Sequence, residues 1–138
     1  MSGEKLIRVS AVVLCDAAGR VLTVRKRGTS RFMLPGGKPE AGESAAETAL
    51  REAREELGVA LDPAQLELLG VFHSAAANEP DHRLESTVFT HPPVKITGPA
   101  AEIAELRWLD PRGELPNDLA PMLQFNVLPA LAATAGAA

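Results

Sequence analysis

Hydrophobic positions in the N-terminal part of the chain fall into short runs separated by polar residues. Residues 6–14 are rich in β-branched side chains and partly alternate, which predicts a strand with a largely buried face. Turn residues follow at Asp16–Gly19, and residues 21–24 form a second apolar run, so the two runs predict a β-hairpin. A basic loop then leads to a short apolar piece that ends at Pro35-Gly36-Gly37.

The clearest helical pattern lies between Ser44 and Leu57. Ser44 and Glu47 have the spacing of a capping box, and Gly58 stands where a helix commonly ends in a left-handed residue. Apolar residues recur at helical spacing and share one face of this helix. That face consists of Ala46, Ala49, Leu50, Ala53 and Leu57.

Further strands are expected after this helix. Residues 66–72 and 84–89 are joined by a polar loop through residues 78–81, and the last strand spans residues 103–109. The sequence has neither an internal repeat nor a linker long enough to divide it. We therefore expect a single α+β domain, residues 1–138.

The C-terminal part of the sequence predicts one more helix. It would run from Asn117 to Leu131 and be interrupted or kinked at Pro121 and Pro129. The small residues 132–138 are expected to fray.

Composition and charge narrow the possible functions. The 138 residues are 46% hydrophobic and 23% charged, which is typical of a globular domain that folds without disulfides. No apolar run approaches the ~20 residues that span a bilayer, and we expect no membrane partner. The N-terminal segment lacks a secretory signal and Cys15 is the only cysteine, so we expect a cytoplasmic protein. The net charge of −4 disfavours binding to a nucleic-acid backbone, but it permits a small anion held through a divalent cation.

Glu52, Glu55 and Glu56 share an arc of about 100° on the helix, away from its apolar face. Like charges one turn apart repel, and the helix dipole disfavours anions in the last turn, so these acids do not serve helix stability. Convergent carboxylates are what Mg²⁺ or Mn²⁺ requires. The alternative is a solvated acidic face with Arg51 and Arg54 in surface ion pairs. The glycines before the helix favour a metal site, because they bring backbone close to the helix N-terminus.

The spacing of these residues resembles the signature of the Nudix hydrolase family. That signature reads glycine, five residues, glutamate, seven residues, arginine-glutamate, an apolar residue, any residue, two glutamates, any residue, glycine and an apolar residue. Here the motif spans residues 37–59, and the resemblance covers nearly the whole chain. It implies an α/β/α sandwich around a mixed β-sheet. The matched fixed positions are Gly37, Glu43, Arg51, Glu52, Glu55, Glu56 and Gly58.

Nudix enzymes hydrolyse a nucleoside diphosphate linked to another group, with divalent cations neutralising the diphosphate. The resemblance therefore implies a pyrophosphohydrolase that requires Mg²⁺ or Mn²⁺. It implies Glu52, Glu55 and Glu56 as metal ligands, with the backbone carbonyl of Gly37 as a further ligand. Glu52 is the expected catalytic base, and Glu55 is the alternative.

Other roles follow from the resemblance with less support from the motif. Arg51 and Glu43 resemble the structural ion pair that ties the glycine loop to the helix. Glu102 is expected as an additional acidic metal ligand, with a solvated loop acid as the alternative. Arg25 and Lys38 are candidates for phosphate contacts, against the alternative of plain surface charges.

Two residues are candidates for contacts with a nucleobase. Phe32 would stack on the base, unless it fills the core. Asn117 would read a purine, as an asparagine does in the branch that cleaves 8-oxo-dGTP, unless it caps the C-terminal helix.

Comparison of the family's branches favours a small nucleoside triphosphate, as in the MutT-like branch, as the substrate. ADP-ribose or a nucleotide sugar is the alternative. From a different class, a non-catalytic regulator that binds nucleotides is also possible, although the motif acids are intact. An RNA-end processor is disfavoured by the acidic net charge. A homodimer is left open.

Overall fold

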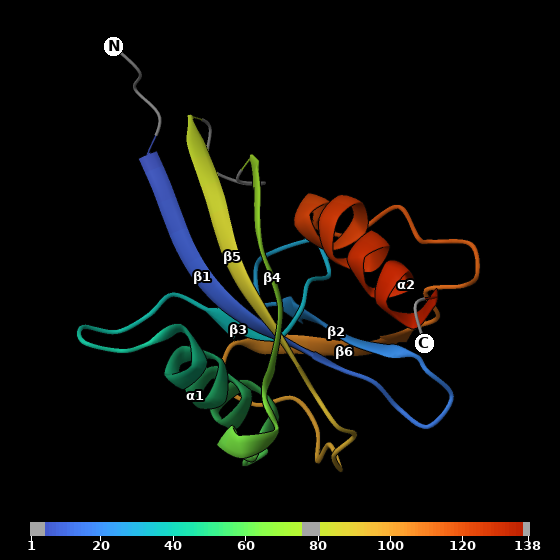
Figure 1. Ribbon diagram of the computed structural model, residues 1–138, viewed down its shortest axis with the longest axis horizontal. Helices are drawn as coiled ribbons and strands as arrows, with labels where there is room; N and C mark the ends of the chain where they lie inside the picture. The colour runs from blue at the N-terminus through green and yellow to red at the C-terminus, as the bar shows by residue number, and fades with distance from the viewer. Residues whose placement is uncertain (1–4, 76–80, 137–138) are drawn as a thin grey trace.

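The computed structural model describes residues 5–75 and 81–136 of the chain (Figure 1). One long helix interrupts a series of strands, and a helical region closes the described chain. The elements, in chain order, are β1 (Lys5–Leu14), β2 (Val21–Lys26), β3 (Gly36–Gly37), α1 (Ala45–Leu57), a 3₁₀ turn (Pro63–Gln65), β4 (Glu67–Ala75), β5 (His82–His91), β6 (Ile103–Leu109), a π-helical segment (Leu123–Val127) and α2 (Leu128–Gly136).

The strands form two sheets, of which the larger is mixed. Its order is β3-β1-β5-β4, with β1 parallel to β5 and antiparallel to β3. Strands β2 and β6 form a separate antiparallel pair. The hairpin predicted from the first two apolar runs is therefore wrong. The chain does reverse at the predicted turn, but only one bridge, between Cys15 and Val21, joins the two runs. Strand β1 instead pairs with β5 on one edge and β3 on the other, and β2 pairs with β6.

Alternation along β1 sends side chains into two separate cores. Val12 and Leu14 pack with Ala53 and Leu57 of α1, whereas Val13 belongs to the core beneath the C-terminal helical region. Figure 1 shows α1 and α2 on opposite sides of the strands. The predicted α/β/α sandwich around a mixed sheet is confirmed.

Both ends of α1 are fixed as the sequence predicts. The Ser44 side chain accepts a hydrogen bond from the Glu47 amide and the Glu47 side chain accepts one from the Ser44 amide, which completes the capping box. At the other end Gly58 adopts φ 69°, and its amide donates to the carbonyl of Arg54. The amide of Ala100 donates to the Glu56 carbonyl at 2.9 Å, so the segment before β6 covers the end of the helix. These caps hold the acidic last turn in place.

The C-terminal helical region begins later than predicted. Asn117 is exposed and lies in a turn, and helical geometry starts at Pro121, where a proline needs no amide partner. The Leu128 amide donates to the Leu123 carbonyl, which widens the helix into a π-helical segment just before Pro129, a residue without an amide hydrogen. The helix continues to Gly136, and residues 137–138 of the predicted frayed tail lie outside the described residues.

The polar loop predicted through residues 78–81 falls mostly outside the described residues, which resume at Asp81.

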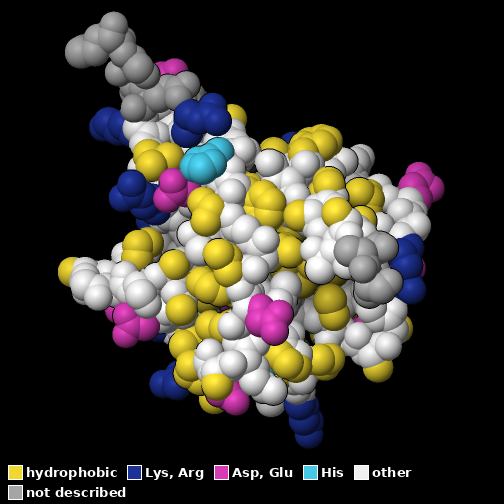
Figure 2. Space-filling model, viewed as in Figure 1, with side chains coloured by type: hydrophobic (Ala, Val, Ile, Leu, Met, Phe, Trp, Pro, Cys, Tyr) yellow, Lys and Arg dark blue, Asp and Glu magenta, His cyan; other side chains and the backbone are white. Residues whose placement is uncertain are grey.

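Among the described segments, none of the helices combines the length and apolar character needed to cross a bilayer. Hydrophobic side chains gather over the middle of the face drawn in Figure 2, near the strands and α2. The large apolar residues most exposed to solvent are Leu6, Leu68, Val71 and Phe125.

Candidate active site

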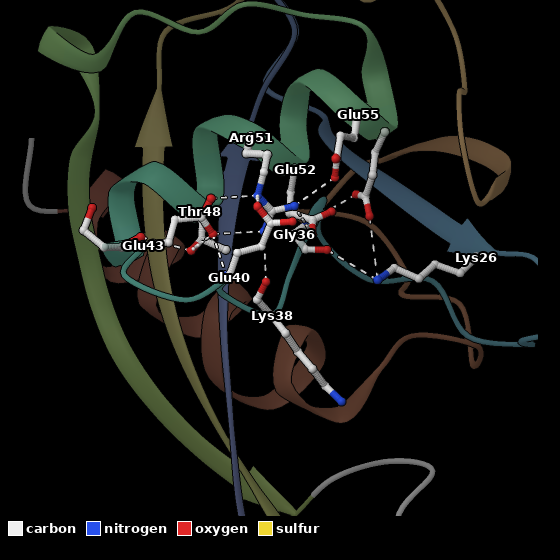
Figure 3. A network of polar contacts seen from close by, with 11 residues as sticks. Lys26, Gly36, Lys38, Glu40, Glu43, Thr48, Arg51, Glu52 and Glu55 are labelled. Atoms are coloured by element: carbon white, nitrogen blue, oxygen red, sulfur yellow. Dashed lines mark hydrogen bonds and ion pairs between the residues drawn. The ribbon is translucent and has the colours of Figure 1, made fainter.

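A dense ion-pair network ties the glycine loop to the start of α1 (Figure 3). Arg51 binds Glu43 with two hydrogen bonds, from Nε at 2.7 Å and from Nη2 at 3.0 Å. The Arg51 Nη2 also donates to the carbonyl of Lys38 at 3.0 Å, and Thr48 Oγ1 donates to Glu43 at 2.8 Å. The Arg51 guanidinium is the main reason why the pKa of Glu43 falls to about 2. We call Glu43, Thr48 and Arg51 the loop anchor.

Glu56, one turn from Glu52, lies in a different environment. Its side chain is almost completely buried, at 5% exposure. Its Oε1 accepts a hydrogen bond from the Gly36 amide at 3.1 Å, and Lys26 Nζ lies 3.7 Å from its Oε2. Burial raises the pKa of Glu56 to about 7, and the neighbouring Glu52 adds to this rise, while Lys26 and the Gly36 amide oppose it. We call Glu52, Glu56 and Lys26 the acid pocket.

The two glycines of β3 permit this close approach of loop and helix. A Cβ atom at Gly36 would collide with the Ser10 carbonyl and with Ala11 of β1. A Cβ atom at Gly37 would overlap the carboxylate of Glu52. The Gly37 backbone and the Glu52 carboxylate are therefore in direct proximity, and any side chain at position 37 would separate them.

Glu55 is much more exposed than Glu52 and Glu56. Its side chain is half exposed, and its Oε1 accepts a hydrogen bond from Arg51 Nη1 at 2.9 Å. The same Nη1 donates to Glu52 Oε2 at 3.1 Å. Arg51 thus links the loop anchor to two of the three motif glutamates.

The oxygen atoms of the acid pocket suit a hard divalent cation. Two carboxylates, Glu52 and Glu56, meet there beside the Gly37 backbone, and the missing side chain at Gly37 leaves the approach open. Within the described residues, no three carboxylate, imidazole or thiol groups converge as placed on a single point. The donor set fits Mg²⁺ or Mn²⁺ by its chemistry, with a third acid still to be supplied.

A cavity of about 230 Å³ opens beside the acid pocket. It lies between the face of the mixed sheet that packs on the C-terminal helical region and that region itself. Its wall is mostly apolar, and Lys26, Lys38 and the two glycines of β3 border it. The apolar wall includes Ile7, Val9, Ala11, Leu34, Leu84, Met122, Leu123 and Val127.

Lys26 is a site residue that the sequence analysis missed. It lies at the end of β2, borders the cavity and donates to the Gly36 carbonyl at 3.4 Å. Alternation from Leu22 and Val24, which face α1, could have predicted this orientation, because Lys26 shares their parity. Lys38 also borders the cavity, and in Figure 3 its side chain points away from the carboxylates.

Three predicted substrate contacts do not line the cavity. Arg25 pairs with Glu105 across the β2–β6 ladder, at 3.1 Å, and donates to a loop carbonyl. Phe32 is 4% exposed and belongs to the core, so its ring is not free to stack on a base. Asn117 is exposed in a turn rather than at a helix N-terminus. Each prediction rested on residue type and position in the chain, which do not determine the direction of a side chain.

Glu102 lies just before β6, close to the last turn of α1. Its carbonyl accepts a hydrogen bond from the Arg27 amide at 2.8 Å, and its side chain is exposed. The preceding residue, Ala101, has φ 53°, a conformation unusual for a residue other than glycine. The nearby Ala100 amide bonds the Glu56 carbonyl, so this segment lies at the end of the helix that carries the motif glutamates, and the role of Glu102 as a ligand stays a prediction.

This combination of fold, glycine loop and acidic helix defines a family. The model of the NUDIX domain matches residues 5–131 of the chain. The chain therefore belongs to the Nudix family.

Relatives in this family differ in their described activities. The chain is 39% identical over 121 residues to an isopentenyl-diphosphate Delta-isomerase of Nocardia farcinica, a match that covers 78% of this chain and only 65% of the Nocardia protein. It is 30% identical over 115 residues to a putative 8-oxo-dGTP diphosphatase of Bacillus subtilis, covering 80% of this chain and 70% of that protein.

Solved structures match over almost the whole chain. The MutT protein from Methanosarcina mazei superposes with a TM-score of 0.78 at 19% identity, covering 97% of this chain and 99% of that one. The E. coli ORF135 protein superposes with a TM-score of 0.75 at 25% identity, covering 97% and 94%. The fold is therefore that of the MutT-like proteins.

Proposed function

We propose that the protein hydrolyses the diphosphate linkage of a nucleoside diphosphate derivative with the help of Mg²⁺ or Mn²⁺. The observation that carries this proposal is the acid pocket. A carboxyl group as deeply buried as Glu56, beside a second carboxyl group, is costly to ionise unless a cation compensates the charge. Lys26 at 3.7 Å supplies only part of that compensation.

When bound, the cation neutralises charge on the diphosphate that is being cleaved. Glu52, Glu56 and the Gly37 carbonyl would hold it, and Glu55 and Glu102 are the candidates for a further ligand. The protein's own contribution is to position these groups. The loop anchor fixes the glycine loop, and Arg51 orients Glu52 through Oε2. Glu52 would then accept the proton of the attacking water, with Glu55 as the alternative base.

The leading substrate is a small nucleoside triphosphate, either a ribonucleotide or a deoxyribonucleotide. Its organic group would occupy the apolar cavity, and Lys26 and Lys38 at the border would contact phosphates. The Bacillus relative described as a putative 8-oxo-dGTP diphosphatase supports this choice. Because Phe32 and Asn117 do not line the cavity, the base would be held mainly by apolar contact. ADP-ribose and nucleotide sugars are the alternative substrates.

A second candidate function is the isomerisation of an unsaturated diphosphate. The Nocardia relative is described as such an isomerase, and an apolar cavity beside a diphosphate site would also accept a short hydrocarbon chain. A non-catalytic role in nucleotide binding is a third candidate, from a different class. The intact motif glutamates favour an enzyme over this third candidate.

One panel assay separates these candidates. Nucleoside triphosphates, ADP-ribose, nucleotide sugars and isopentenyl diphosphate are each incubated with the protein, with Mg²⁺ or with EDTA. We expect phosphate or pyrophosphate release from a nucleoside triphosphate that requires the metal. Migration of the double bond without phosphate release, detected by proton NMR, would instead support the isomerase. Metal-independent turnover would contradict the proposal, and nucleotide binding without turnover would support the regulator.

A further inference from the structure

Outside the motif, Arg107 of β6 makes an unusual set of contacts. Its guanidinium lies over the ring of Phe32, with Cζ 3.7 Å from the ring centroid. It also binds Asp118 with two hydrogen bonds, from Nη1 at 3.0 Å and from Nη2 at 2.6 Å. We call Phe32, Arg107 and Asp118 the clasp. It joins the segment around Phe32 to β6 and to the turn at Asp118, both of which lie much later in the chain.

Backbone hydrogen bonds also join two of these segments, around Phe32 and Asp118. The Phe32 amide donates to the Asp118 carbonyl and the Ala120 amide donates to the Phe32 carbonyl, both at 2.8 Å. Arg31 Nη1 donates to the carbonyl of Leu119 at 3.1 Å. Segment 118–120 is thus held against the strand-like piece that leads to the glycine loop.

Both clasped segments continue directly into the wall of the cavity. After Phe32 come Met33 and Leu34, and after Asp118 comes the stretch from Ala120 to Leu123, all of which line the cavity. No member of the clasp itself lines it. The clasp therefore lies behind the wall, at the point where these two stretches meet.

The geometry of Arg107 is specific to arginine. Its Nε atom is buried and has no hydrogen-bond partner among the described residues. An unpaired buried donor is unfavourable, so the planar guanidinium is held here for its stacking on Phe32 and its two bonds to Asp118. A lysine would keep the charge but lose both the stacking and the paired bonds.

We propose that Arg107 and Asp118 are positioning residues that set the width of the cavity and thereby the affinity for the organic group of the substrate. This inference rests on the proposed function, since it assigns the cavity to that organic group. The clasp does not contact the acid pocket, so it acts on binding of the organic group and leaves the chemical step alone.

The test compares Arg107→Met and Asp118→Asn with the wild type in steady-state kinetics on the nucleotide that the panel identifies. We expect KM to rise ~5- to 10-fold, as for loss of charged hydrogen bonds, while kcat stays within about 2-fold. The inhibition constant of inorganic pyrophosphate, which lacks an organic group, should change less than about 2-fold. Asp118→Asn preserves the shape of the side chain, so it carries the test if Arg107→Met does not fold.

Arg20→Met is the matched control, because it removes an ion pair of 2.7 Å, to Asp16, from a turn that does not line the cavity. We expect wild-type KM from it. An unchanged KM in the folded clasp variants would overturn the inference. An equal rise in KM and in the pyrophosphate inhibition constant would also overturn it, because that result means general damage.

A second measurement needs no turnover and so separates this inference from the proposed function. Amide hydrogen exchange of Phe32 and Ala120 reports directly on the backbone bonds beneath the clasp. Exchange ~10-fold faster in Arg107→Met, with no change in Arg20→Met, supports the clasp even if the wild type cleaves no nucleotide. Unchanged exchange at both amides in Arg107→Met would overturn it.

Discussion

Two groups of charged residues meet on α1, and their charges are compensated to very different degrees. In the loop anchor, Glu43 receives two hydrogen bonds from Arg51 and one from Thr48, and its pKa falls to about 2. In the acid pocket, Glu56 is buried beside another glutamate with one amide and a more distant lysine, and its pKa rises to about 7.

This contrast distinguishes architecture from chemistry. Opposite charges in contact stabilise the folded loop, which is what a structural element needs. Like charges buried together destabilise the fold unless something else binds. The loop anchor therefore explains how the glycine loop is held in place, and the acid pocket explains why the site would bind a cation.

The largest expected effect is on catalysis by Glu52. Glu52→Gln preserves the shape of the side chain but removes the proposed base, so kcat should fall at least ~10²-fold. The loop anchor should be intact in this variant, since Arg51 keeps Glu43. Steady-state kinetics on the best nucleotide, with a melting curve to verify folding, measures the effect.

Glu55→Gln provides the comparison for this prediction. Glu55 is half exposed and paired with Arg51, so we expect a smaller loss. Near wild-type turnover by Glu52→Gln, together with an inactive Glu55→Gln, would show that Glu55 is the base.

The next effect concerns pH and the metal-free protein. The folded pKa of Glu56 is raised above its unfolded value, to about 7, so the folded state holds the proton more tightly. The free energy of unfolding should therefore fall as pH rises from about 4.5 to about 7, by up to about 3 kcal/mol. Urea unfolding in EDTA at a series of pH values measures this.

Two variants isolate the contribution of Glu56 to that pH dependence. Glu56→Gln should remove the decline, whereas Glu55→Gln, with its half-exposed side chain, should retain it. A decline of the same size in both variants would assign it to other groups.

The stability lost on breaking the loop anchor should have the opposite pH dependence. Arg51→Met should lower the melting temperature at neutral pH, because Glu43, Glu52 and Glu55 all lose a donor. The folded pKa of Glu43 is depressed to about 2, so this stabilisation is complete above its unfolded pKa and is lost as pH falls through about 2. The difference from wild type should thus shrink in acid.

Arg54→Met, on an exposed position of the same helix, is the control for Arg51→Met. We expect it to melt close to wild type at every pH. A difference between Arg51→Met and wild type that persists undiminished at pH 2 would mean that Arg51 stabilises the loop by packing alone.

The smallest effect is expected for Lys26. Lys26→Met removes the partial compensation of Glu56, so in EDTA at pH 8 it should lower stability by up to ~1 kcal/mol. At pH 5, where Glu56 is protonated, the loss should disappear. Lys38→Met, whose side chain points away from the carboxylates, should show no such pH dependence (Figure 3).

Local signals in the sequence predicted α1 and its surroundings well. The capping box at Ser44, the glycine at its C-terminal end and the spacing of the motif are all properties of neighbouring residues, and the structure reproduces each of them. The contact between Arg51 and Glu43 also follows from the motif, because Glu43 stands just before the helix that carries Arg51.

Partners that are distant in the sequence could not be predicted in the same way. Alternation in β1 identified a strand but not its neighbour, which proved to be β5 in a parallel arrangement. The aromatic and amide residues chosen as base contacts, Phe32 and Asn117, were placed by tertiary packing in the core and in a turn. Lys26 was missed because its role depends on the burial of Glu56, which only the folded chain reveals.

The most direct test of the central claim, that a cation compensates the buried charge of Glu56, is a thermal melt of wild type and Glu56→Gln at pH 8, in EDTA and in saturating Mg²⁺. In EDTA, Glu56→Gln should melt at the same temperature as wild type or higher, because it removes a charge that is costly to bury. In Mg²⁺ the order should reverse, since wild type gains about 2.7 kcal/mol at a metal concentration ~100-fold above Kd and the variant gains little. Equal stabilisation of both proteins by Mg²⁺ would contradict the claim, and the cation would then bind without Glu56.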